Sequence, residues 1–160
     1  MDEHSYFENQ DRQLTFYVQK IKLIAVKEDP AGESIYIESP ETVYGLDFLQ
    51  HELLLSDREI FICLHLNIKN SLLTWEVVSV GSLNFSVVHP REVYKGAILS
   101  NAASIIFCHN HPSGDLEPSP EDIAVTKRLQ DAGKLLGIQV LDHIIFGEES
   151  FVSLKERGIL

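Results

Sequence analysis

Hydrophobic residues along this 160-residue chain follow two spacings, each typical of one type of secondary structure. Nearly continuous apolar runs predict strands that are buried on both faces. Alternation of β-branched or aromatic residues with polar ones predicts strands that are buried on one face, and a short polar turn between two strands predicts a hairpin. The predicted strands are residues 14–26, 35–37, 59–67, 72–80, 104–108, 138–146 and 151–153.

Apolar residues three or four positions apart, the spacing of one helix face, mark three further segments at residues 39–54, 90–99 and 119–136. Each has a proline in its first turn, where the missing N–H costs no hydrogen bond. In the third segment Ser119 is the expected N-cap, and Gly133 or Gly137 marks the end. Because strands and helices alternate without a linker or repeat, the pattern predicts one α/β domain.

Composition excludes several classes of protein. Apolar residues make up 44% of the chain, which is enough for a buried core, but no run approaches the ~18 apolar residues of a membrane span. The polar, acidic first residues do not resemble a signal peptide. Cys63 and Cys108 both lie in apolar runs and are expected to be buried and reduced. We therefore expect a cytoplasmic protein with no membrane partner.

The charge balance concerns possible partners. The chain has 24 acidic and 13 basic side chains, for a formal net charge of −11. Binding to a phosphate backbone depends on lysines and arginines that displace condensed counterions, and here the basic residues are scattered. Direct binding to nucleic acid is therefore not expected.

The candidate chemistry lies in a polar segment with several prolines, which follows the predicted strand 104–108. His109 and His111 are two positions apart, so on an extended backbone both imidazoles point to the same side. With seven histidines in the chain such a pair also arises by chance, and it could equally be two hydrogen-bonded loop histidines. The wider context has to decide between these interpretations.

That context is Asp122, in the first turn of the helix predicted to begin after Ser119. By itself, an acid three residues after a serine is an ordinary capping residue. In the same place its carboxylate can also face the loop that carries His109 and His111. Two imidazoles, one carboxylate and an open fourth position are typical of a catalytic zinc site, where the metal activates a water molecule at neutral pH.

These residues resemble a known signature. The segment from His109 to Asp122 is similar to the metal-binding motif of the JAB/MPN (JAMM) metallopeptidase superfamily, which is H-x-H, seven residues, Ser, two residues, Asp. Residues 81–84, 89–92 and 141–143 resemble further motifs of the RadC family within that superfamily. The resemblance implies a single JAB/MPN (cytidine deaminase-like) domain, in which a mixed, curved sheet is flanked by helices.

The resemblance covers roughly residues 56–160, which form the expected RadC-like JAB/MPN domain. Residues 1–55 match less well and are expected to be a strand and helix segment of the same domain. The helix-hairpin-helix module that usually precedes this domain in RadC proteins is not recognisable here. We therefore do not expect a DNA-binding role that depends on that module.

The resemblance also implies roles for single residues. The two histidines and Asp122 would bind Zn²⁺, and Ser119 would help to polarise the substrate carbonyl. The superfamily places a glutamate at the start of an earlier central strand as general base, and Glu59 fits that position. Glu92 is the alternative, although it stands at a predicted helix start, where a capping or ion-pair role is more common.

Three neighbours of the motif need separate interpretations. Cys108 alternates with His109 along the strand, so it is expected to pack on the opposite face. Asp115 is expected to order the loop rather than to bind the metal. His143 is expected to be a core histidine, or one that contacts a metal ligand from behind.

The function expected from these features is zinc-dependent hydrolysis of amide or isopeptide bonds in a peptide or protein substrate. Two alternatives from other classes remain. One is a DNA repair or recombination accessory protein, as the RadC name suggests. The other is a catalytically inactive interaction module that uses the JAB/MPN fold to bind a partner protein.

Overall fold

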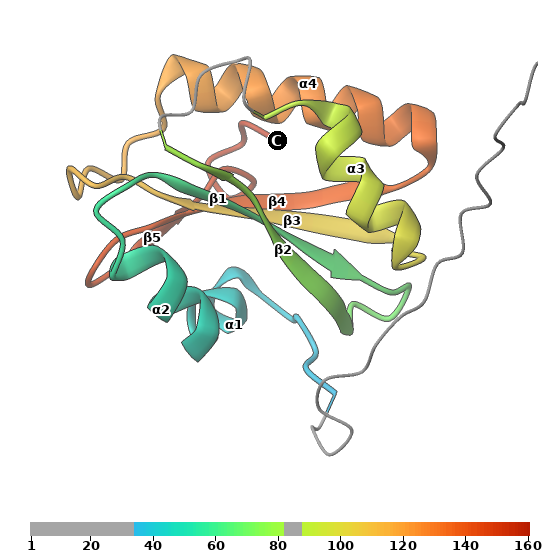
Figure 1. Cartoon of the computed structure of the whole chain (residues 1–160), viewed down its shortest axis with the longest axis horizontal. Coiled ribbons are helices and arrows are strands. Elements are labelled where there is room, and N and C mark those ends of the chain that lie inside the picture. Colours follow the sequence, from blue (N-terminus) through green and yellow to red (C-terminus); the bar gives the residue numbers. More distant parts are fainter. Residues whose placement is uncertain (1–33, 82–87) are drawn as a thin grey trace, which may run out of the picture.

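The computed structural model describes residues 34–81 and 88–160. The described strands form one five-stranded sheet in the order β2-β1-β3-β4-β5 (Figure 1). The strands are β1 (Ile60–Leu66), β2 (Leu72–Val80), β3 (Ser104–Asn110), β4 (Gln139–Phe146) and β5 (Phe151–Ser153). The helices are α1 (Pro40–Tyr44), α2 (Asp47–Leu54), α3 (Pro90–Leu99) and α4 (Pro120–Leu136).

The sheet is mixed, as predicted. β1 runs antiparallel to both β2 and β3, β3 and β4 are parallel, and β5 is antiparallel to β4. Helices α1 and α2 cover one face, and α3 and α4 cover the other (Figure 1). Every residue of β1 and of β3 is buried, because helices cover both faces of these central strands.

Alternate residues of β1 and β3 belong to two separate apolar cores. Ile62 and Cys108 lie with Leu49 in the core under α1 and α2. Phe61 and Phe107 lie in the core under α3 and α4. The predicted separation of Cys108 from its neighbour His109 is therefore confirmed, and the face under α3 and α4 is the one that carries the histidines discussed below.

Helix α4 has the ends that the sequence predicts. The Ser119 hydroxyl accepts a hydrogen bond from the backbone N–H of Asp122, and the Asp122 carboxylate accepts one from the backbone N–H of Ser119. This reciprocal pair is a capping box. Of the two candidate glycines, Gly137 ends the helix, because it adopts φ 71°, a left-handed conformation that glycine reaches without strain.

Three predicted elements differ from the structure. The helix expected over residues 39–54 is two helices, and the break at Gly45 lets both Val43 and Leu49 reach the core. The strand expected over 104–108 continues to Asn110. Instead of a strand at 35–37 there is a single bridge between Tyr36 and Ser71.

The strand predicted over residues 14–26 lies outside the described residues. The described part of the first 55 residues packs on the sheet through α1 and α2, while the division at residue 56 stays a prediction. Among the helices of residues 34–81 and 88–160, none combines the length and the apolar character needed to span a bilayer.

Candidate metal centre

The two candidate histidines lie at the carboxyl end of β3. His109 is in the strand and is 0% exposed, whereas His111 is the first residue after the strand and is partly exposed. Their ring centroids are 4.7 Å apart. The structure thus brings the two imidazoles to the same spot, as their spacing predicts.

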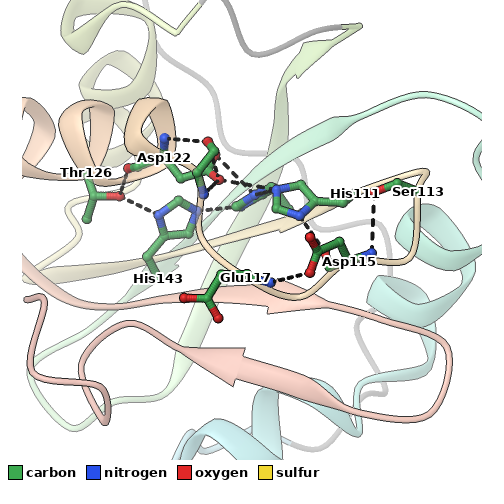
Figure 2. Close-up of polar contacts among 9 residues, drawn as sticks. His111, Ser113, Asp115, Glu117, Asp122, Thr126 and His143 are labelled. Atoms are coloured by element: carbon green, nitrogen blue, oxygen red, sulfur yellow. Dashed lines mark hydrogen bonds and ion pairs between the residues drawn. The ribbon is translucent and has the colours of Figure 1, made fainter.

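The loop after β3 holds the His111 ring in place (Figure 2). His111 Nδ1 donates to the backbone carbonyl of Asp115 at 2.5 Å. The Asp115 carboxylate accepts from the backbone N–H of Glu117 at 2.9 Å. Asp115 therefore orders the loop within which His111 is fixed, in agreement with its predicted role.

Asp122 is both a helix cap and a member of the site. Its side chain is 1% exposed, and its Oδ2 accepts from the backbone N–H and the hydroxyl of Ser119, both at 2.7 Å. The same carboxylate reaches both histidines, with Oδ1 3.3 Å from His109 Nε2 and Oδ2 3.2 Å from His111 Nε2. The capping interpretation and the ligand interpretation are therefore compatible.

The positions of the ring protons show whether this group fits a cation. A carbonyl oxygen only accepts, so His111 carries its proton on Nδ1, and in a neutral ring Nε2 is then a bare lone pair. This Nε2 lies 2.9 Å from His109 Nε2 and 3.2 Å from the Asp122 carboxylate. Two ligand atoms bound tetrahedrally to one metal ion at ~2.05 Å lie about 3.3 Å apart. The Asp122 oxygens lie 3.3 and 3.2 Å from the two histidine Nε2 atoms, so their spacing suits a single metal ion.

In the described part of the chain, these three residues form the only cluster of at least three His, Cys, Asp or Glu side chains whose ligand atoms meet, with all of them within 4.8 Å. Three protein ligands of types N, N and O leave a fourth position for solvent or substrate. The group can therefore hold a divalent metal with an open position.

Electrostatics support a carboxylate in contact with imidazoles. Burial tends to raise the pKa of Asp122, but the contacts with His109 and His111 outweigh it and hold that pKa well below its usual range. The Asp122 hydrogen bond raises the pKa of His111, burial opposes this, and the charge of Glu59 adds to the increase. Burial lowers the pKa of His109. Without a metal, His111 is thus the ring that takes up a proton most easily.

The site opens into a cavity of about 360 Å³, and its lining residues are Glu59, His111, Ser113, Asp115, Glu117, Ser119, Glu121 and Asp122. Two of the predicted catalytic residues, Glu59 and Ser119, therefore border the same space as the metal ligands. Glu92 is not among the lining residues; its carboxylate lies 2.9 Å from Lys95 Nζ and 3.3 Å from Arg91 Nε on the surface of α3. The location favours Glu59 as the general base, and that role stays a prediction.

Asn110 fixes the backbone on both sides of Glu59, a role that the sequence reasoning missed. Its side-chain Oδ1 accepts from the backbone N–H of Ile60 at 2.7 Å, and its Nδ2 donates to the carbonyl of Arg58 at 3.0 Å. Because Asn110 lies between the two histidines in the sequence, this clamp ties Glu59 to the end of β3. The signal available in the sequence was a buried amide at the end of an apolar strand, which has to find partners.

Two further residues lie behind His109, and the sequence analysis predicted only one of them. His109 Nδ1 is 2.8 Å from His143 Nε2, and His143 Nδ1 is 2.6 Å from the Thr126 hydroxyl (Figure 2). The expectation that His143 contacts a ligand from behind agrees with this geometry. Thr126 was not predicted, although it lies one helical turn after Asp122 and so shares its face of α4.

Comparison with known proteins agrees with this fold. The family model described as "RadC-like JAB domain" matches residues 37–159. A UPF0758 protein of Desulforamulus reducens is 53% identical over 131 residues, which are 82% of this chain and 57% of that protein. One of Bacillus velezensis is 49% identical over 135 residues, 84% of this chain and 58% of that protein.

An archaeal relative shows the same level of similarity. A UPF0758 protein of Methanosarcina mazei is 53% identical over 124 residues, which are 78% of this chain and 53% of that protein. The chain thus spans slightly more than half the length of these curated relatives. The match of the family model over most of the chain, together with this identity, shows that the chain belongs to the family of RadC-like JAB domains.

Proposed function

We propose that this chain is a zinc-dependent hydrolase that cleaves amide or isopeptide bonds of a peptide or protein. The observation that carries the proposal is the convergence of His109 Nε2, His111 Nε2 and the Asp122 carboxylate beside a cavity that Glu59 also lines. When bound there, zinc would act as a Lewis acid toward the substrate carbonyl and would lower the pKa of a water molecule at its open position.

Glu59 would move the proton. Its carboxylate would take a proton from the attacking water and deliver it to the leaving nitrogen, so that the amine departs in a neutral form. The Asn110 clamp on the neighbouring backbone groups supports this role, since a general base has to stay within hydrogen-bond reach of the reacting atoms.

Ser119 would assist at the substrate carbonyl. In the structure its hydroxyl donates to Asp122 Oδ2, and its backbone N–H donates to the same oxygen. Rotation about the Cβ–Oγ bond would redirect the hydroxyl into the cavity, and the backbone N–H would still hold Asp122. The hydroxyl could then stabilise the negative charge that develops on the carbonyl oxygen.

The test compares two carboxylate-to-amide variants of the zinc-loaded chain on peptide and isopeptide-linked substrates. We expect Glu59→Gln to keep its zinc and to lose at least about 100-fold in turnover, the lower range for a general base. Glu92→Gln is the matched control and should keep both zinc and turnover. Full hydrolytic activity in Glu59→Gln would reject the mechanism.

The same measurements separate the other two functions. An inactive interaction module would bind zinc and cleave no substrate in a panel of peptide and isopeptide bonds. For a DNA repair accessory, no observation on residues 34–81 or 88–160 offers support, since the cavity lining is acidic and the formal net charge of the chain is −11. Salt-dependent binding to single-stranded or forked DNA would be required to revive that alternative.

A further inference from the structure

His143 lies in β4 and faces helix α4. It is not among the residues that line the cavity beside the candidate metal centre. It is 0% exposed and packs edge-on against the rings of Phe61 and Phe107, at centroid distances of 5.3 and 5.7 Å. Its two nitrogens face His109 and Thr126. The ring is therefore held by apolar walls, and its only described polar contacts are these two residues.

The direction of each hydrogen bond follows from the Thr126 hydroxyl. Thr126 Oγ1 lies 2.6 Å from the backbone carbonyl oxygen of Asp122, which can only accept, so the hydroxyl proton points there. Thr126 Oγ1 is also 2.6 Å from His143 Nδ1. With its proton already used, the hydroxyl oxygen accepts, and His143 carries its proton on Nδ1.

The same reasoning fixes the proton of His109. A neutral imidazole has one N–H, so His143 Nε2 is an acceptor, and His109 Nδ1, 2.8 Å away, is the donor. His109 Nε2 is then left with a lone pair that points toward His111 and Asp122. The His143 ring is 0% exposed between two phenylalanine rings, and such surroundings disfavour a charged imidazole.

From this chain of contacts we propose that His143 and Thr126 are positioning residues, which hold His109 in the tautomer and orientation that present Nε2 to a metal. The same hydrogen bonds also reach the third ligand, because Thr126 donates to the backbone carbonyl of Asp122. The inference rests on the metal site of the proposed function and does not depend on hydrolysis.

His111 is oriented by a different device. Its Nδ1 proton goes to a backbone carbonyl in a surface loop, whereas the His109 proton goes to a buried side chain contributed by another strand. Hydrogen-bond partners of this kind set ligand orientation and basicity, and their removal typically lowers metal affinity about 10–100-fold. Removing the hydrogen bonds of His143 and Thr126 should therefore lower the zinc affinity measurably.

The first test measures the zinc dissociation constant of the full chain by competition with a chromogenic chelator. Thr126→Val preserves side-chain volume and removes the hydroxyl, and we expect zinc binding to weaken about 10-fold or more. Thr74→Val is the matched control, because Thr74 also bonds a buried histidine, His65, at 2.7 Å. It should leave zinc binding unchanged.

The second test replaces His143 itself. His143→Leu removes the acceptor and should weaken zinc binding about 10–100-fold, whereas His143→Gln keeps a carbonyl oxygen that can accept from His109 and should restore part of the affinity. Thr126→Val carries the test where His143→Leu does not fold. Zinc affinities within about twofold of the parent chain in both Thr126→Val and a folded His143→Leu would overturn the proposal, since such partners normally matter more than this.

A spectroscopic readout reports the tautomer directly. In the zinc-loaded chain labelled with ¹⁵N-histidine, long-range ¹H–¹⁵N spectra should show His109 protonated at Nδ1, with slow exchange of that proton because the ring is 0% exposed. In Thr126→Val and His143→Leu this exchange should accelerate. Protonation of His109 at Nε2 in the zinc-loaded parent would also overturn the proposal. Neither the protonation state of His109 nor its proton exchange depends on cleavage. The expected spectra therefore support the positioning role even where no peptide is hydrolysed.

Discussion

Two buried histidines on the same face of the sheet have different surroundings. His109 in β3 is 0% exposed and His65 in β1 is 2% exposed, and both rings form a short hydrogen bond through Nδ1. At Nε2 they diverge. His109 Nε2 meets two further ligand atoms, whereas His65 Nε2 and its neighbour Glu76 Oε1, 3.5 Å apart, both lack a hydrogen-bond partner.

The difference follows from what covers each histidine. His109 lies at the end of its strand, where a loop and the first turn of α4 add His111 and Asp122 and leave a cavity. Helix α3 covers His65 closely, since a Cβ on Gly96 would collide with the Glu76 carboxylate and the His65 ring. The residue of α3 that approaches His65 is Gly96, which has no side chain to offer as a ligand, whereas the loop and the first turn of α4 add two ligand side chains beside His109.

The largest expected effect separates the two histidines by metal affinity. Asp122→Asn keeps a side-chain acceptor for the helix cap but removes the ligand charge, and we expect zinc affinity to fall more than about 100-fold, beyond the usual effect of an outer partner. His65→Gln should bind zinc like the parent chain. Isothermal titration of both variants checks this, and weakened zinc binding in His65→Gln would erase the distinction.

The next largest effect is a loss of folding stability at acidic pH, caused by the buried ring of His65. Burial lowers its pKa from 6.5 to about 4, so between these values the unfolded chain takes up a proton that the folded chain does not. Stability that is present above pH 6.5 is therefore lost as the pH falls toward 4, by at most about 3 kcal/mol.

Urea unfolding of the parent chain and of His65→Gln at pH 7 and pH 4.5 isolates this contribution. The variant should lose less stability between the two values, because the other titrating groups, including Glu76, remain in both proteins. An equal loss in both chains would show that His65 does not contribute.

A smaller effect tests how closely α3 covers His65. Gly96→Ala places a methyl group against Glu76 and His65, and we expect about 1–3 kcal/mol of destabilisation from overpacking. Zinc affinity should not change, since the added methyl is next to the other histidine. Thermal unfolding together with a zinc titration gives both readouts, and a variant as stable as the parent would show that α3 can move away.

The smallest effect concerns the contact between the two helices on this face. The Tyr94 hydroxyl donates to the carbonyl of Leu129 at 2.6 Å and so joins α3 to α4. Tyr94→Phe should cost about 1 kcal/mol, the usual net value of one hydrogen bond, because the Leu129 carbonyl keeps its place in the helix. Chemical denaturation measures the change, and unaltered zinc binding is the expected control result.

Several parts of the fold and site were predictable because their signals are local. The capping box of α4 depends on two residues three positions apart, and the shared direction of the two histidine side chains depends on strand alternation over two positions. The break at Gly45 was not predictable from spacing, because apolar positions across it still fit one helical pattern. The break is determined by packing against the sheet, where both Val43 and Leu49 are buried.

By itself, the sequence determined which atoms can serve as ligands and that His109, His111 and Asp122 belong to one strand–loop–helix unit. Only the tertiary structure decided what supports them. Asn110 reaches Arg58 and Ile60 across some fifty residues, and His143 meets His109 only because β4 pairs with β3 in a register that places residue 143 opposite residue 107. Contacts between strands depend on register and on which helix covers the face, and neither is encoded in the spacing of neighbouring residues.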